Sequence, residues 1–162
     1  MSGATKVLAG DLDITYEAVD ANVKAGQLVV PSTTATSDPS LQGATPAGAN
    51  ATNVLGVASK DAVTMANRAA LESSTGPAPL SAFVTDASVP DATFVAYNNT
   101  VTWVNYLAGT AVPYGAPLKA AAGGAVTLFV IGTDDPARKV GWCAQKGGVG
   151  TGGGTAKARI NV

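Results

Sequence analysis

The feature that most limits the fold of this chain is a succession of short β-type segments, each bounded by Gly, Pro, Asn or Asp. Leu12, Ile14, Tyr16 and Ala18 alternate with polar residues, which is the period-two pattern of a half-buried strand. Similar strand character is found in segments 26–31, 53–58, 80–87, 93–97, 101–106, 110–114, 125–131, 140–144 and 156–162. We therefore predict an all-β fold, a single-domain sandwich or barrel of about ten short strands that spans residues 1–162.

The remaining segments are expected to connect or flank these strands. Residues 1–10 have no strand pattern and are expected to form a flexible N-terminal arm. Residues 32–52 are almost wholly small or polar, which predicts a long surface loop. Residues 60–72 are compatible with a short helix or with an extended connection. Asn98 and Asn99 tolerate positive φ, so residues 97–101 are expected to form a hairpin turn.

A weak internal repeat predicts that the fold has two similar halves. Gly26 is echoed by Gly115 at an offset of 89 residues, and Gly56 by Gly141 at an offset of 85. In each half the first glycine precedes a strand that leads into a long loop, and the second lies inside the strand that returns. Glycine weakens a strand interior, so its presence there predicts a bulge or a close approach of two backbones.

Charge and composition limit the partners of the chain. Charged residues are only 13% of the sequence and nearly cancel, to a net charge of −1. The lysines and arginines are scattered along the chain, so no basic face is expected, and nucleic acid is excluded as a partner. Only 6% of the residues are aromatic, and the apolar residues are mostly Ala and Val. Such small side chains suit closely spaced β layers better than a large ligand cavity.

The residue types that carry most enzyme chemistry are scarce. The chain has no histidine, which removes the commonest general base and the commonest zinc ligand. The single cysteine, Cys143, is expected to be a buried strand residue and suits a reducing cytosol. No window resembles a signal peptide or a membrane span, so we expect synthesis in the cytoplasm and no membrane partner.

Three motifs could suggest chemistry, and each has a simpler explanation. The glycine run 148–153 has the spacing of a dinucleotide or phosphate loop, but too little chain follows it, and Gly154 occupies the position of the phosphate-binding lysine. Lys60 resembles the modified lysine of a carrier domain, but no matching strand follows it directly. Asp11 and Asp13 are expected to be a solvated face. We predict no catalytic, cofactor-binding or metal-binding residues, no cofactor and no enzymatic activity.

Four segments carry a resemblance to a known family. Residues 24–30, 53–62, 114–127 and 140–144 resemble the capsid decoration, or cement, proteins of tailed bacteriophages, and the resemblance covers roughly residues 20–160. It implies a β-rich homo-oligomer, with a trimer favoured, on the outer surface of the phage head. It also implies that the partner is the assembled lattice of the major capsid protein, which the chain would stabilise, and that no catalytic residue is present.

A second function stays open, namely a head-fibre or adhesin-like module that binds host-surface carbohydrate. Its support is the group of Trp103, Tyr106 and Tyr114 in one region of the sequence. Packing in the core is the simpler expectation for these three aromatic side chains.

Overall fold

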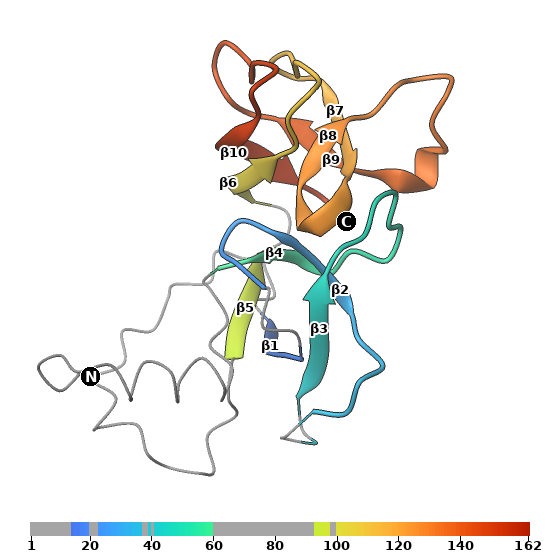
Figure 1. Cartoon of the computed structure of the whole chain (residues 1–162), viewed down its shortest axis with the longest axis vertical. Helices are drawn as coiled ribbons and strands as arrows, with labels where there is room; N and C mark the ends of the chain where they lie inside the picture. Colours follow the sequence, from blue (N-terminus) through green and yellow to red (C-terminus); the bar gives the residue numbers. More distant parts are fainter. Residues whose placement is uncertain (1–13, 20–22, 37–38, 40, 60–92, 98–99) are drawn as a thin grey trace, which may run out of the picture.

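The chain folds into two small β-barrels that follow each other along the sequence. The computed structural model describes residues 14–19, 23–36, 39, 41–59, 93–97 and 100–162. Within these residues there are ten β-strands and two short 3₁₀ turns, and no α-helix. The strands form two closed five-stranded barrels, which lie one above the other in Figure 1. The predicted all-β fold of about ten short strands is confirmed, with barrels as its architecture.

The N-terminal barrel closes in the order β1-β3-β2-β4-β5. Its strands are β1 (Ile14–Ala18), β2 (Leu28–Pro31), β3 (Gln42–Pro46), β4 (Gly56–Ala58) and β5 (Thr93–Tyr97). Strands β1 and β3 run parallel, and every other pair is antiparallel. Closure leaves no unpaired sheet edge, although these strands are short.

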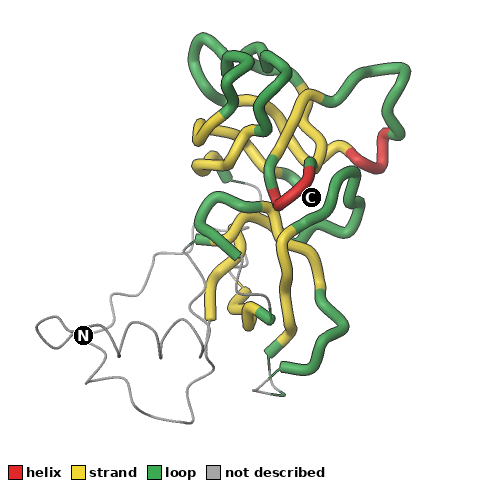
Figure 2. Tube along the Cα trace, in the orientation of Figure 1, coloured by secondary structure: helices red, strands yellow, loops and turns green. Residues whose placement is uncertain are grey.

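The C-terminal barrel closes in the order β6-β8-β7-β9-β10. Its strands are β6 (Val101–Tyr106), β7 (Pro117–Ala120), β8 (Val126–Leu128), β9 (Lys139–Cys143) and β10 (Gly154–Ile160). The 3₁₀ turns η2 (Ala122–Gly124) and η3 (Pro136–Arg138) are the red segments of Figure 2. Here β6 and β8 are the parallel pair, so the two barrels have the same topology, strand for strand. The prediction of two similar halves is confirmed.

The repeated glycines occupy equivalent places in the two barrels. Gly26 precedes β2 with φ of 79°, and Gly115 precedes β7 with φ of 76°. This left-handed conformation is open to glycine at little cost. Gly56 begins β4, and Gly141 lies inside β9, where a Cβ atom would collide with the carbonyl oxygen of Arg159 on β10. The predicted close approach of two backbones is confirmed at Gly141.

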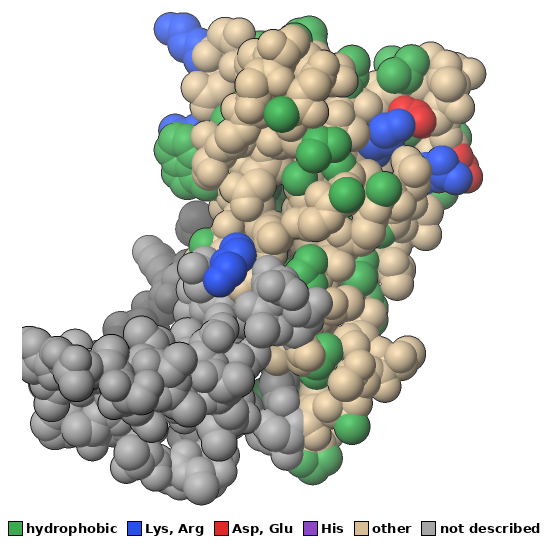
Figure 3. Space-filling model, in the orientation of Figure 1, with side chains coloured by type: hydrophobic (Ala, Val, Ile, Leu, Met, Phe, Trp, Pro, Cys, Tyr) green, Lys and Arg blue, Asp and Glu red, His purple; other side chains and the backbone are tan. Residues whose placement is uncertain are grey.

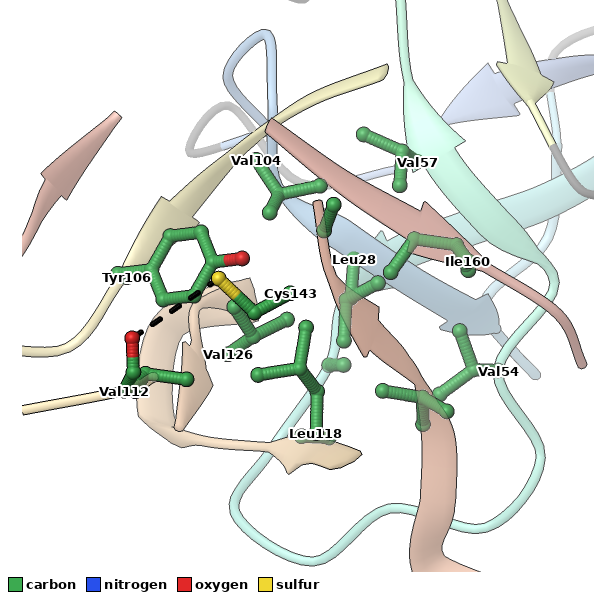
Figure 4. Packing of buried hydrophobic residues seen from close by; sticks show 14 of the residues in the cluster. Leu28, Val54, Val57, Val104, Tyr106, Val112, Leu118, Val126, Cys143 and Ile160 are labelled. Atoms are coloured by element: carbon green, nitrogen blue, oxygen red, sulfur yellow. Dashed lines mark hydrogen bonds between the residues drawn. The ribbon is translucent and has the colours of Figure 1, made fainter. Parts of the chain in front are cut away.

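The two barrels share a hydrophobic core. Leu28 and Val57 of the N-terminal barrel belong to the same buried cluster as Val104, Leu118 and Ile160 of the C-terminal barrel (Figure 4). A second, smaller cluster of Tyr16, Ala18, Val23, Val29, Ala44 and Ala58 lies within the N-terminal barrel. The core is built mostly of Val, Ala and Leu, as expected from the scarcity of aromatic residues.

Backbone hydrogen bonds also join the barrels. The N–H of Asn105 in the C-terminal barrel donates to the carbonyl oxygen of Gly26 in the N-terminal barrel at 2.9 Å. In the other direction, the N–H of Asn50 donates to the carbonyl oxygen of Ala120 at 2.9 Å. Buried backbone groups need such partners, and here each barrel supplies partners for the other. The contact between the barrels is therefore a specific one.

Three expectations about strands are wrong. The segment 32–52 is not one loop, since it contains β3, which pairs with both β1 and β2. The segment 110–114 is not a strand; within it Val112 makes a single bridge to Val149, and the strand forms later, as β7. The segment 97–101 does not join a hairpin, because β5 and β6 belong to different barrels.

Several expectations fall on residues that lie outside the described ranges. They are the arm 1–10, the helix or extended connection at 60–72, the strand 80–87, and the residues Asp11, Asp13 and Lys60.

Candidate binding faces

The only cysteine lies in the core. Cys143 is 2% exposed at the end of β9, and its Sγ lies 3.9 Å from the carbonyl oxygen of Val112, the contact dashed in Figure 4. The predicted burial of Cys143 is confirmed. Tyr106 is buried beside it, and its hydroxyl donates to the carbonyl oxygen of Lys157 at 3.1 Å. Burial raises the pKa of Tyr106, and the contact with Cys143 adds to the effect. Both side chains are structural.

Strand β10 presents a polar outer surface with strict alternation. Ala156, Ala158 and Ile160 point into the barrel, whereas Thr155, Lys157 and Arg159 are exposed. Strand β10 pairs with β6 on one side and β9 on the other, so its outward side chains lie in the middle of a sheet surface. A strand held on both edges is a rigid support for a binding surface.

Two tryptophans flank β10 on this surface. Trp103 of β6 lies opposite Lys157, and Trp142 of β9 lies opposite Arg159. Val101 of β6 also lies opposite Arg159. We call the outer surface formed by Val101, Trp103, Trp142, Lys157 and Arg159 the tryptophan face.

Each tryptophan of this face lies beside a cation. The ammonium of Lys157 lies 5.5 Å from the ring centroid of Trp103, and that of Lys139 lies 4.0 Å from the ring centroid of Trp142. Both distances are within the range of a cation–π interaction, which adds about 0.5–1 kcal/mol at exposed sites. Contacts of this strength favour a position of each lysine over its ring and still leave the exposed side chain able to move away.

The expectation that core packing explains the aromatic residues is correct for only one of the three. Tyr106 is buried, but Trp103 is 55% exposed and Tyr114 is 69% exposed. Large exposed aromatic side chains are characteristic of binding surfaces. The sequence could not separate the three, because the side of the sheet that each residue faces depends on its strand register.

A hollow of about 440 Å³ opens beside Trp142. Its lining residues are Gly115, Pro117, Phe129, Ile131, Gly132, Asp134, Pro136, Lys139 and Trp142. The lining is mainly apolar, and the volume falls in the range of small-ligand sites. The hollow lies on the surface, where Pro117 of β7 and Lys139 and Trp142 of β9 meet the neighbouring loops.

The loop along one side of the hollow is held by Asp134. The Asp134 carboxylate accepts a hydrogen bond from the Lys119 ammonium at 2.7 Å and another from the Val130 N–H at 2.7 Å. The Lys119 ammonium and the Val130 N–H hold the pKa of this carboxyl below its usual value. The anchored loop exposes two aliphatic side chains, Val130 and the 81% exposed Ile131.

Positive charge gathers in the C-terminal part of the chain. Residues 100–162 contain six basic and two acidic side chains, whereas residues 1–99 contain four basic and nine acidic ones. The net charge of −1 therefore combines +4 in one part with −5 in the other. The charged side chains are thus unevenly divided between the two parts of the chain, although their charges sum to nearly zero. On the side shown in Figure 3, charged side chains are few among the apolar and uncharged surface.

The described residues contain neither a metal-binding cluster nor a helix that could span a membrane. No group of three or more His, Cys, Asp or Glu side chains there could hold a metal ion. In the same part of the chain, no helix is long and apolar enough to cross a membrane.

The architecture defines a class of protein, an all-β protein of two five-stranded barrels with the same strand order and a shared core. A solved structure with a similar fold is the N-terminal base of the head fibre protein gp8.5 of bacteriophage phi29. The similarity covers 93% of this chain and 94% of that one, with a TM-score of 0.54 and 18% sequence identity. It therefore extends over both barrels. Neither a protein-family model nor a curated protein sequence matches the chain.

Proposed function

We propose that this chain is a non-enzymatic structural protein of a phage virion, attached to the outer surface of the head. The observation that carries the proposal is the similarity in fold to a head-fibre base over 93% of the chain. A match of both barrels supports a common architecture more strongly than a match of one small barrel would. The resemblance of segments 24–30, 53–62, 114–127 and 140–144 to capsid decoration proteins favours the same location.

The proposed partner is the assembled lattice of the major capsid protein, which the bound chain would stabilise. Exposed apolar side chains on anchored loops, above all Ile131 and Val130, are suited to such a contact. A stable contact buries roughly 800 Å² on each partner, and low charge leaves most of its free energy to area and shape. We also propose that the chain is synthesised in the host cytoplasm and acts as a homo-oligomer, with a trimer favoured, without cofactor, nucleic acid or membrane.

The test of this proposal is binding to heads. Purified chain is mixed with expanded shells and, separately, with free capsid protein. Binding to shells only is expected, because a lattice contact exists only where capsid subunits are neighbours. Decorated heads should also rupture at a higher temperature than bare heads, since a ligand of the intact state stabilises that state. Identical rupture temperatures would reject stabilisation, and absence of binding would reject attachment to the head.

A second candidate function is that of a head-fibre or adhesin-like module that binds host-surface carbohydrate. The exposed rings of Trp103 and Tyr114 favour it, because indole and phenol rings stack on the C–H faces of sugars. This function predicts that heads lacking the chain keep their rupture temperature but lose attachment to cells. Both functions can occur in one protein, on different faces.

A further inference from the structure

The tryptophan face has the shape of an extended binding platform. Trp103 lies opposite Lys157, and Trp142 lies opposite Arg159, two residues further along β10. From standard strand and residue spacings, the two tryptophan Cα atoms are about 12 Å apart, diagonally across β10. Two rings at this separation on one sheet can contact successive units of a polymer. A single small ligand would reach only one of them.

The cations of this platform have no carboxylate partner among the described residues. The only ion pair in that part of the chain joins Lys119 to Asp134, away from β10. Lys139, Lys157 and Arg159 are all exposed, so an external anion can reach them. The net charge of +4 over residues 100–162 favours an anionic occupant in addition to these local contacts.

An anionic sugar polymer fits the platform better than a protein surface or a nucleic acid does. The core of a protein interface is depleted of charge, whereas this face places Lys157 and Arg159 at its centre and has Val101 as its one aliphatic member. Nucleic acid carries a charge on every nucleotide, and the basic side chains Lys139, Lys157 and Arg159 at this face are too few to neutralise such a dense polyanion. A polysaccharide offers C–H faces to indole rings and spaces its anionic groups more widely.

We propose that the tryptophan face binds an anionic polysaccharide, a sugar chain that bears carboxylate or phosphate groups. Sugar rings replace Lys157 on the face of Trp103 and Lys139 on the face of Trp142, since each lysine contact is weak. The displaced ammonium groups and the Arg159 guanidinium then donate hydrogen bonds to the anionic groups of the polymer. This proposal rests on the second function above and specifies its ligand class and its site. It does not depend on attachment to the head.

The test measures binding of the full chain to three polymers by isothermal titration, without phage heads. The probes are polygalacturonate, phosphorylated dextran and neutral dextran. Binding of at least one anionic polymer is expected, with at least tenfold lower affinity for neutral dextran. The affinity should also fall as salt rises from 50 to about 200 mM, because salt screens exposed charges at these concentrations.

Variants locate the site. We expect W103A to reduce the affinity for the anionic polymer about tenfold, and the double variant K157Q/R159Q to reduce it at least as much. The control K24Q makes the same chemical change on an exposed lysine of the N-terminal barrel and should leave the affinity unchanged. Because all of these side chains are exposed, the melting temperatures of the variants should stay close to that of the parent chain, which verifies folding.

Each contrary outcome overturns a stated part of the proposal. Equal affinity for neutral dextran would leave carbohydrate binding in place and reject the anionic ligand class. Anionic binding that survives W103A and K157Q/R159Q would reject the tryptophan face as the site. If a single-stranded oligonucleotide, titrated in the same way, bound more tightly and lost this binding in K157Q/R159Q, the face would be assigned to nucleic acid. Absence of binding to all three polymers would reject the proposal, whereas the carbohydrate function is judged separately by the attachment of heads to cells, and head attachment by its own test.

Discussion

The N–H of Gly124 in the C-terminal barrel donates a hydrogen bond to the carbonyl oxygen of Ala47 in the N-terminal barrel, at 2.8 Å. Gly124 has φ of 71°, and a Cβ atom there would lie 2.7 Å from the carbonyl oxygen of Leu28. Its neighbour Gly123 has φ of 65° but open space around it. The two adjacent glycines therefore share a backbone conformation, and only one of them is pressed against the other barrel.

This contrast gives a test of the contact between the barrels. G123A should cost about 1–2 kcal/mol of unfolding free energy, from the left-handed conformation alone. G124A should cost a further 1–3 kcal/mol or so, because the added methyl group is forced against the N-terminal barrel. Denaturant unfolding of both variants measures the difference. Equal losses would mean that the barrels are only loosely packed.

The contact between the two barrels predicts that they unfold together. Whether they do so tests the prediction that residues 1–162 form a single domain. Both tryptophans lie in the C-terminal barrel, so their fluorescence reports on that barrel, whereas far-ultraviolet circular dichroism sums over both. The shared core predicts coincident transitions by the two probes. Two separate transitions would show two independently stable domains.

Gly141 is expected to be irreplaceable in β9. In G141A the methyl group would collide with the backbone carbonyl of Arg159, and the paired strands β9 and β10 cannot move apart without losing hydrogen bonds. A loss of about 1–3 kcal/mol or more is expected, seen as a lower melting temperature or loss of soluble protein. The control G152A adds the same methyl group in open space and should change stability by less than about 0.5 kcal/mol. Similar effects of the two substitutions would contradict the close approach.

The thiol of Cys143 should react slowly in the folded protein. Its side chain is buried next to Tyr106 and Val112, so a labelling reagent reaches it only when the barrel opens. Labelling should accelerate strongly in denaturant. Fast labelling of the folded chain at neutral pH would contradict this packing.

Acid should release the loop that Asp134 anchors. The folded state lowers the pKa of this carboxyl, so its stabilising contribution is complete above the unfolded value of about 3.8 and is lost as pH falls through the lower folded value. D134N should therefore destabilise the loop at neutral pH and lose this difference under acid conditions. Hydrogen exchange of the Val130 amide measures this loss of loop stability.

Between about pH 6 and 8 binding to heads and binding to carbohydrate should both be nearly constant, because the chain has no histidine to titrate.

Sequence patterns by themselves determined the class of the fold and part of its internal organisation. The alternation around Ile14 and Tyr16 marked a true strand, and strands 93–97 and 101–106 have the predicted bounds. The spacing of Gly26 and Gly115 indicated the two halves, because a positive φ is a local requirement that one residue type meets.

Tertiary structure alone decided where the small and polar strands pair and which side chains face outward. Strand β3 has the sequence Gln-Gly-Ala-Thr-Pro, which lacks an apolar period and is a strand only because β1 and β2 bind it on both sides. The register of β6 and β9 against β10 likewise places Trp103 and Trp142 on one exposed face. A shift of one residue would turn each side chain to the opposite face, so the binding surface depends on pairing between distant segments, which local pattern cannot specify.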